Sequence, residues 1–275
     1  MTLGRKTALY LAVVVILLWS LLPLVWMLVV ALLPADNLNS RPVNLDLSKL
    51  DLGGFAARFG DGSFRNAMLH SFIIASATTL ACLLIGSLAG YSLARIRFSG
   101  KSLFMGAALA TQMIPGVILL IPIFLVFRQL GLTDSMLGLV LLYSAFLLPY
   151  SIWLLRGFFE EVPIALEQAA RLDGCSRVGA LFRIIIPVAA PGLAATAIFL
   201  YISTWNEFLF ALVLTLQNSK TATVALAEIQ GQIFGAQDYT ALATAAVLVI
   251  LPPVLIAVLL NRYLVRSLAE SAVKG

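Results

Sequence analysis

Six long runs of apolar residues alternate with more polar segments along the chain. A helix needs about 20 residues to cross a hydrocarbon core of about 30 Å, and each run is long enough to do so. We therefore predict an all-α, polytopic membrane protein, with six transmembrane helices in a single domain over residues 1–275. The predicted spans cover residues 8–33, 67–94, 103–127, 136–155, 192–216 and 241–260.

The composition supports a membrane protein. The chain is 61% hydrophobic and 11% charged, whereas soluble domains average about 45–50% apolar and about 25% charged residues. The first apolar run is longer than the roughly 7–15 residues expected of a signal peptide, so we predict a true span there. The net charge of +5 forms no basic stripe, which argues against nucleic-acid binding.

The basic residues predict the orientation. With the N-terminus in the cytoplasm, 12 of the 18 Lys and Arg residues fall in inside segments and the remaining 6 in outside segments. Cytoplasmic loops carry the excess of Lys and Arg in membrane proteins. We therefore predict a multi-pass protein of the cytoplasmic membrane, in contact with lipid, whose N- and C-termini are both cytoplasmic.

The longest predicted cytoplasmic connection, residues 156–191, contains a helix signal. Pro163 suits the first turn of a helix, and Glu160-Glu161 lie where the helix dipole favours negative charge. Gly174 suits the position just after a helix end, where φ is positive. These signals predict a helix of about three turns over Ile164–Asp173.

This predicted loop helix has two interpretations on spacing alone. Small residues at Ala165, Ala169 and Ala170 would let another surface approach closely, and the neighbouring charges would orient a docking partner. An ordinary amphipathic helix on the membrane surface fits the same pattern.

The loop resembles the signature cytoplasmic loop of permease subunits in ATP-binding-cassette importers. That pattern is Glu-Ala-Ala, three residues, Gly, nine residues, Ile, one residue, Leu-Pro. The chain has Gln168-Ala169-Ala170, then Gly174, then Ile184 and Ile186-Pro187 at the same spacing. It departs from the pattern at Gln168 and at Ile186, and a glutamate stands one position earlier, at Glu167.

The resemblance covers nearly the whole chain and indicates the sugar branch of these permeases. The run Trp205-Asn206-Glu207-Phe208 is similar to one common in that branch, and Ala272-Val273-Lys274-Gly275 resembles the tail of the maltose-importer type. The resemblance implies a sugar importer that works by alternating access. It also implies a heterodimer with a second permease, two ATPase subunits and an extracytoplasmic sugar-binding protein.

The resemblance implies roles for three groups of residues. The ATPase-coupling residues would be Glu167, Gln168, Ala169, Ala170, Asp173 and Gly174. The tail residues that reach between the ATPases would be Val273, Lys274 and Gly275. The loop that contacts the binding protein would include Gly231, Gln232 and Gly235, and its two glycines allow an irregular path. The chain itself would bind no cofactor, since ATP and Mg would be used by the partner subunits.

An acidic side chain lies inside the fifth predicted span. A charge at membrane depth costs about 2.5–3.5 kcal/mol, so Glu207 should face the interior of the bundle or a water-filled cavity. With Trp205 and Asn206, and with Gln112 in the third span, it would line a sugar path. The alternative is an interhelical hydrogen bond that holds the bundle together.

Other functions find less support. The alternative cargo for the same importer class is a glycerol phosphate ester or another polar solute. A membrane-embedded enzyme would need a catalytic or metal constellation, but the only histidine, His70, lies at the edge of an apolar run, and the two cysteines have no metal-ligand spacing. Gly100-Lys101-Ser102 lacks the earlier glycine of a phosphate-binding loop. We therefore predict no catalytic residue, no metal site and no enzymatic activity.

Overall fold

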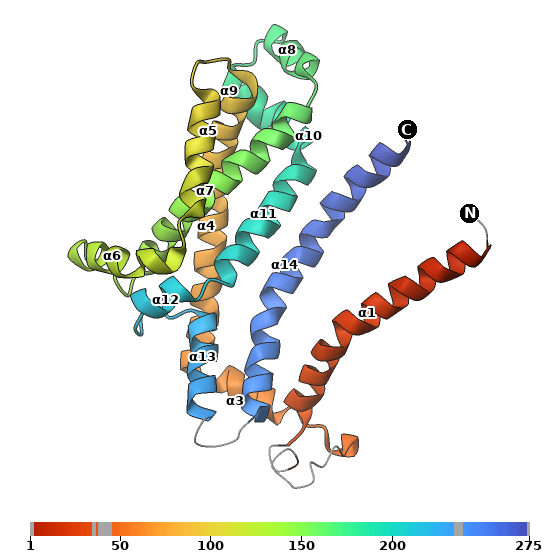
Figure 1. The fold of residues 1–275 in the computed structure, drawn as a ribbon, viewed down its shortest axis with the longest axis vertical. Helices are drawn as coiled ribbons and strands as arrows, with labels where there is room; N and C mark the ends of the chain where they lie inside the picture. The colour runs from red at the N-terminus through yellow and green to blue at the C-terminus, as the bar shows by residue number, and fades with distance from the viewer. Residues whose placement is uncertain (1–2, 35–36, 38–45, 234–238, 274–275) are drawn as a thin grey trace. The chain divides into compact units, whose positions relative to one another are not determined.

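The computed structural model describes residues 3–34, 37, 46–233 and 239–273, and this part of the chain is helical, without a strand (Figure 1). Side chains are described throughout these ranges except at residues 3–4, 8, 47, 232–233 and 263–273. The chain forms two compact units, each described below by itself. The first comprises Met1–Asn66 and Ala225–Leu251, and the second comprises Ala67–Val224 and Pro252–Gly275.

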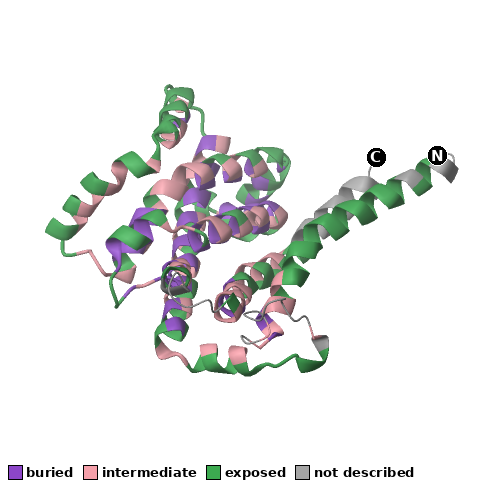
Figure 2. Cartoon of the chain, turned by 60° about the horizontal axis from the view of Figure 1, so that its bottom comes forward, coloured by how far each residue is buried: buried purple, intermediate pink, exposed green. Residues whose placement is uncertain are grey.

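The first unit is built around a long apolar helix, α1 (Leu3–Leu32). Side chains along α1 point outward, with Trp19 84% exposed and Leu22 70% exposed. Figure 2 shows the exposed colour along most of α1. Such a surface suits a lipid environment. The other elements of this unit are the short turn η1 (Leu47–Lys49), α3 (Gly53–Gly60), and parts of α13 (Ala222–Ile233) and α14 (Tyr239–Val273).

The second unit holds the remaining helices. In chain order they are α4 (Gly62–Arg95), whose first turn belongs to the first unit, then α5 (Lys101–Ala110), η2 (Thr111–Met113), α6 (Gly116–Gln129), α7 (Met136–Glu161), α8 (Ile164–Leu172), α9 (Arg177–Ala180), the π-helical turn η3 (Leu181–Ile185), α10 (Ile186–Val188), α11 (Ala190–Trp205) and α12 (Leu209–Leu214). Within this unit, α8 lies at one end, away from α12 (Figure 1).

Four described helices are long and apolar enough to cross a membrane as continuous elements: α1, α4, α7 and the Tyr239–Arg262 part of α14. Two bent pairs raise the number to six if each pair is one span. One pair is Lys101–Met113 with Gly116–Gln129, bent by 93°, and the other is Arg177–Val188 with Ala190–Trp205, bent by 83°.

Two predicted spans differ in the structure. The span predicted over 103–127 is not one straight helix, because it breaks at Ile114-Pro115, where both residues have extended ψ angles of 119° and 123°. Proline provides no N–H to continue the helical hydrogen bonds. The span predicted over 192–216 ends its long helix at Trp205, and α12 begins only at Leu209.

Two glycines bring α4 and α7 into close contact. A Cβ on Gly86 would clash with the Ser151 hydroxyl, and one on Gly90 would lie 3.0 Å from the backbone nitrogen of Arg156. The Ser151 hydroxyl donates to the carbonyl of Cys82 at 2.7 Å. Small residues four apart allow backbones to approach in this way.

Candidate functional site

The loop after α7 forms a short helix that is well defined at both ends. Pro163 precedes α8, and its ψ of 128° separates α8 from α7. At the other end Gly174 has a φ of +89°. The Gly174 N–H donates to the carbonyl of Arg171 at 3.2 Å, and the Cys175 N–H donates to that of Ala170 at 3.0 Å. This paired arrangement is the Schellman motif, which needs the left-handed conformation that glycine adopts at no steric cost.

The outer face of α8 exposes large apolar side chains among polar ones. Leu172 is 89% exposed, Ile164 is 58% exposed and Leu166 is 41% exposed. Gln168, Ala169 and Asp173, which the sequence assigned to ATPase coupling, are also exposed. Gly174 is exposed as well, and a Cβ at this position would meet none of the described atoms within 4 Å. The arrangement therefore offers a small, ordered apolar surface at one end of the second unit.

The inner face of α8 holds a buried carboxylate. Glu167 is 8% exposed, and neighbouring Ala170 is 6% exposed. The Tyr91 hydroxyl donates to Glu167 Oε1 at 2.6 Å, and Arg95 Nε lies 3.2 Å from Glu167 Oε2. Two of the six predicted coupling residues are thus buried, and one of them, Glu167, contacts the end of α4.

The chain between α8 and α11 contains a rare helical form. The Ser176 hydroxyl accepts a hydrogen bond from the Gly179 N–H at 3.0 Å and begins α9. The π-helical turn η3 follows, and Leu181 and Ile185 within it are fully buried. They belong to a cluster with Tyr91, Leu155, Phe159, Val162 and Ala189. A π-turn inside a helix is often found at functional sites.

Glu207 lies at the break between α11 and α12. Its carboxylate accepts hydrogen bonds from the Tyr143 hydroxyl at 2.5 Å and from the backbone N–H groups of Phe210 at 2.9 Å and Ala211 at 3.1 Å. It therefore satisfies two of the free N–H groups in the first turn of α12, as a capping side chain does. The same carboxylate joins α12 to α7.

A cavity of about 190 Å³ opens beside Glu207. Its lining residues are Tyr143, Phe146, Leu147, Ser203, Thr204, Glu207 and Phe210. The rings of Phe146 and Phe210 lie 5.1 Å apart. Aromatic faces beside a few polar groups are typical of small-molecule sites.

The other residues predicted for a sugar path are placed differently. Gln112 Nε2 donates to the carbonyl of Phe146 at 3.1 Å, so it contacts a residue of the cavity without lining it. Trp205 is buried and its ring stacks on Tyr201 with centroids 5.8 Å apart. Asn206 is exposed just after the end of α11.

The loop after α12 is held by one aspartate. Asp134, in the turn before α7, has a φ of +51°, and its carboxylate accepts hydrogen bonds from the backbone N–H groups of residues 216–219 at 2.9–3.3 Å. Partial burial alone would raise the pKa of Asp134, but the N–H groups of Leu216, Asn218 and Gln217 lower it to about 2. The turn before α7 and the loop after α12 are therefore fixed to each other.

The same loop is also attached to α4. The Ala222 N–H donates to the Ser71 hydroxyl at 2.8 Å, and His70 Nδ1 lies 3.1 Å from the carbonyl oxygen of Lys220. The Thr223 hydroxyl donates to the carbonyl of Glu207 at 2.9 Å. His70, at the edge of an apolar run in the sequence, thus contacts the backbone of a distant loop.

The segment predicted to contact a binding protein is only partly described. Gly231 lies within α13 rather than in an irregular path, so this part of the expectation is wrong. A single glycine inside a helix costs only about 1 kcal/mol, which neighbouring residues can offset. Gln232 is helical but its side chain lies outside the description, and Gly235 lies outside the described residues, as do Lys274 and Gly275 of the tail. Val273 ends α14.

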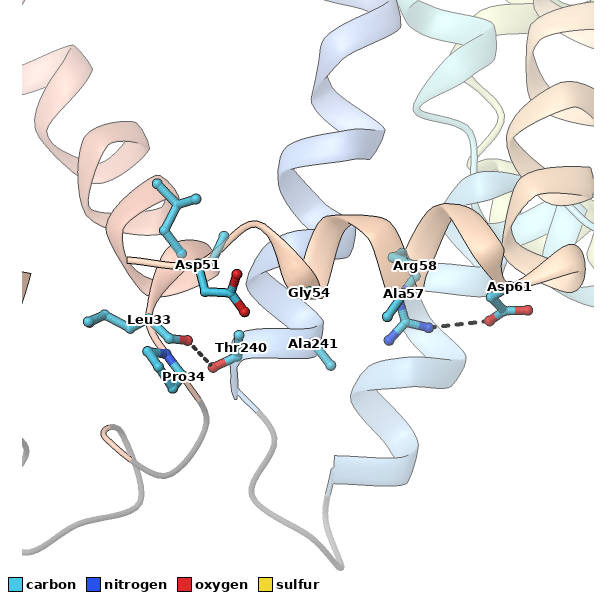
Figure 3. A pocket seen from close by; sticks show the side chains of 11 residues that line it. Leu33, Pro34, Asp51, Gly54, Ala57, Arg58, Asp61, Thr240 and Ala241 are labelled. Atoms are coloured by element: carbon cyan, nitrogen blue, oxygen red, sulfur yellow. Dashed lines mark hydrogen bonds and ion pairs between the residues drawn. The ribbon is translucent and has the colours of Figure 1, made fainter. Parts of the chain in front are cut away.

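The first unit has a cavity of about 440 Å³ that the sequence did not reveal. Its lining comes from the end of α1, from α3 and from the start of α14 (Figure 3). Arg58 pairs with Asp61 at 3.4 Å, and the Thr240 hydroxyl donates to the carbonyl of Leu33 at 3.1 Å. Three separate segments form this cavity, so no local pattern predicts it.

Sequence reasoning also missed four polar partners: Tyr91, Arg95, Asp134 and Tyr143. Tyr91 and Arg95 stand four residues apart at the end of a predicted span, which is the spacing of one helix face. That spacing was the available signal for the first two. No local pattern identifies the other two, since their partners lie 64 or more residues away.

Comparison with known proteins gives consistent matches. The family model described as "Binding-protein-dependent transport system inner membrane component" matches residues 82–270. The chain is 35% identical to the trehalose transport system permease protein SugB of Mycobacterium tuberculosis, over 99% of this chain and 100% of that protein. It is 32% identical to the trehalose/maltose transport system permease protein MalG of Thermococcus litoralis, over 98% of each.

Two solved structures share the fold. A bacterial ABC transporter involved in import of the acidic polysaccharide alginate matches with a TM-score of 0.77 at 22% identity, over 96% of this chain and 98% of that chain. The bacterial alginate transporter in complex with an alginate pentasaccharide-bound periplasmic protein matches with a TM-score of 0.66 at 15% identity, over 94% of each.

Proposed function

Because the chain belongs to the family of binding-protein-dependent transport system inner membrane components, we propose that it moves a di- or oligosaccharide into the cytoplasm by alternating access. As a member of this family it is a multi-pass permease subunit of an ATP-binding-cassette sugar importer and not an enzyme. ATP is bound with Mg and hydrolysed by separate ATPase subunits. The single observation that supports the proposal most is the well-defined helix α8, whose outer face exposes large apolar side chains.

We assign α8 as the surface on which an ATPase subunit docks. The exposed Leu172, Ile164 and Ala169 offer apolar area, and Asp173 offers a charge that orients the partner. Gln168 replaces the glutamate of the family pattern, so the contact at this position uses a neutral amide. This assignment places α8 and both chain termini in the cytoplasm. The tail residues Val273, Lys274 and Gly275 then extend toward the two ATPases.

The other partners follow from the same assembly. A second, related permease completes the membrane path, and an extracytoplasmic binding protein delivers the sugar. One of the two alginate transporter structures is a complex with such a sugar-bound periplasmic protein. We assign the contact with this protein to the segment around Gly231, Gln232 and Gly235, which follows the loop held by Asp134.

We propose that the cavity beside Glu207 is part of the sugar path. Phe146 and Phe210 offer ring faces on which a sugar stacks, and Ser203 offers a hydroxyl. Glu207 holds the break between α11 and α12 open through its three internal hydrogen bonds, so its main role is to shape the cavity.

The cargo is tested by uptake into vesicles. The chain would be reconstituted with its second permease and ATPases in proteoliposomes containing ATP, and the loaded binding protein would be added outside. We expect uptake of labelled trehalose or maltose, since both names occur among the relatives. Uptake of labelled glycerol phosphate esters with no uptake of any di- or oligosaccharide would contradict the proposed cargo.

A further inference from the structure

The contact between Glu167 and α4 joins the inner face of α8 to a long helix through charged groups. The Tyr91 hydroxyl and Arg95 Nε approach the two carboxylate oxygens separately, at 2.6 and 3.2 Å. Arg95 Nη2 also donates to the carbonyl of Val162 at 2.6 Å, one residue before Pro163. A single side chain of α4 therefore contacts both α8 and its joint with α7.

Burial makes this contact hard to open. The side chains of Arg95 and Glu167 are 9% and 11% exposed. Separating two buried, paired charges leaves each without a partner in a poorly solvating environment, which is strongly unfavourable. Tyr91, which donates to Glu167, also belongs to the apolar cluster with Phe159 and Leu181. The pair therefore fastens α8 to a packed part of the second unit.

The chain that follows α8 connects it to α11 less directly than the Glu167 contact connects it to α4. It passes through the π-helical turn η3 and then bends by 83° between Arg177–Val188 and Ala190–Trp205. Bends and π-turns are places where a helix can change its angle. By contrast, α4 contains no proline and is continuous from Gly62 to Arg95.

The far end of α4 is attached as well. Ser71 and His70 contact the backbone of residues 220–222, in the loop that Asp134 holds. The 20 residues from Ser71 to Tyr91 span about 30 Å of helix, which is the thickness of a bilayer core. A straight element thus connects α8 with the loop beyond α12.

We propose that Glu167 is a positioning residue that fastens α8 to α4, so that α4 carries the motion of α8 to the loop of residues 215–221 and the start of α13. The inference rests on the proposed function, in which an ATPase subunit displaces α8. In this proposal the buried face of α8 transmits the motion to α4, and the exposed face of α8 binds the ATPase subunit.

The test uses the complete reconstituted importer and compares sugar uptake with ATP hydrolysis in the same vesicles. For Glu167→Ala we expect uptake per ATP hydrolysed to fall about tenfold or more, while the ATPase subunits still co-purify, because the docking face is intact. Tyr91→Phe should lower the same ratio by a smaller factor. Glu161→Gln is the matched control, since it removes an exposed carboxylate three residues before α8 and should leave the ratio unchanged.

A double variant distinguishes the loss of the contact between α8 and α4 from the effect of leaving Arg95 as an unpaired buried charge. Replacing both groups by apolar ones, as Glu167→Leu with Arg95→Met, removes the unpaired charge and keeps the volume filled, so it should recover much of the ratio lost in Glu167→Ala. A Glu167→Ala complex with the wild-type ratio would overturn the proposal. Loss of the ATPase subunits from that complex would also overturn it, because Glu167 would then serve docking.

Hydrogen exchange of backbone amides tests the contact between Glu167 and α4, and the result does not depend on which solute the complex transports. In the purified complex, exchange of residues 164–172 should rise in Glu167→Ala and stay unchanged in Glu161→Gln, and equal exchange in both would contradict the contact. If the wild-type importer shows no sugar-dependent ATP hydrolysis while exchange behaves as expected, the proposed function fails and the fastening stands.

Discussion

The two ends of the second unit are each organised by one carboxylate, but the partners differ. Glu167 is held by side chains of α4, through Tyr91 and Arg95. Asp134 is held mainly by backbone N–H groups of residues 216–219, with the side chains of Asn218 and Ser219 as further donors. The first contact depends on which residues stand on a distant helix, whereas the second depends on the loop conformation. The carboxylate at the α8 end can therefore lose its partners through a single change on α4, whereas the contacts of Asp134 do not involve α4.

The largest effect is expected from Gly90→Leu, which pushes α4 away from α7 next to Tyr91. A Cβ at this position already lies 3.0 Å from the backbone of Arg156, and overpacking of this kind typically costs about 1–3 kcal/mol or more. Amide exchange should rise over residues 164–172 and stay low over residues 216–219. Gly106→Leu, where the space is open, is the control. Equal loss of protection at both ends would contradict the independence of the two contacts.

Asp134→Ala should act on the opposite end. Loss of the acceptor leaves several backbone N–H groups to water, and we expect a loss of about 1–3 kcal/mol in the stability of the loop, with faster exchange at residues 216–219. Protection of residues 164–172 should not change. If both ends exchange faster, the comparison between them is wrong.

The pH dependence at Asp134 follows from its lowered pKa. The folded-state pKa of about 2 lies below the ordinary value of 3.8, so the carboxylate stabilises the loop above about pH 4 and this contribution is lost as the pH falls toward 2. Exchange at residues 216–219, corrected for its intrinsic pH dependence, should be constant between about pH 5 and 8. A change within that range would point to another titrating group.

Tyr143→Phe tests whether Glu207, which lies between the two ends of the second unit, shapes the cavity or binds sugar directly. Removing the hydroxyl leaves one bond of the carboxylate unmade, and we expect about 1–2 kcal/mol of lost stability with little change in the KM for sugar. The measurement is a thermal transition of the complex beside uptake kinetics. A strongly raised KM at unchanged stability would instead place Glu207 in direct contact with sugar.

The smallest effect is expected from Glu160→Gln. Glu160 pairs with Arg156 at 2.9 Å and with Lys101 at 3.7 Å, but its side chain is 42% exposed. Exposed pairs contribute about 0–1 kcal/mol, so uptake per ATP and stability should stay close to wild type. A loss comparable to that of Glu167→Ala would show that burial is not what distinguishes the two glutamates.

Much of the architecture could be predicted from the sequence, because apolar length and helix-end signals are local. The family resemblance seen in Gln168–Pro187 is confirmed by the family match, and Gly174 has the positive φ that its place after a helix predicted. The helix predicted over Ile164–Asp173 is observed one residue shorter, as α8.

What could not be predicted depends on tertiary contacts. The size of the bend at Ile114-Pro115 is one example, because the sequence does not say how far a proline turns a helix. The partners of Glu167 and Glu207 stand 76 and 64 residues away in sequence. Pairing over such separations is decided by helix packing. The spacing of Tyr91 and Arg95 indicates a shared helix face but not its partner, and no local signal marks Tyr143.

The most direct test of the central claim is ATP hydrolysis by the reconstituted complex, with and without sugar-loaded binding protein, for wild type and for Gly174→Val. Valine at a φ of +89° costs about 1–3 kcal/mol and disrupts the end of α8. Gly157→Val, on an exposed and open helical position, is the control. We predict strong stimulation in wild type and control, and its loss in Gly174→Val at normal membrane insertion. Stimulation that survives in Gly174→Val, or is absent from wild type, would contradict coupling through α8.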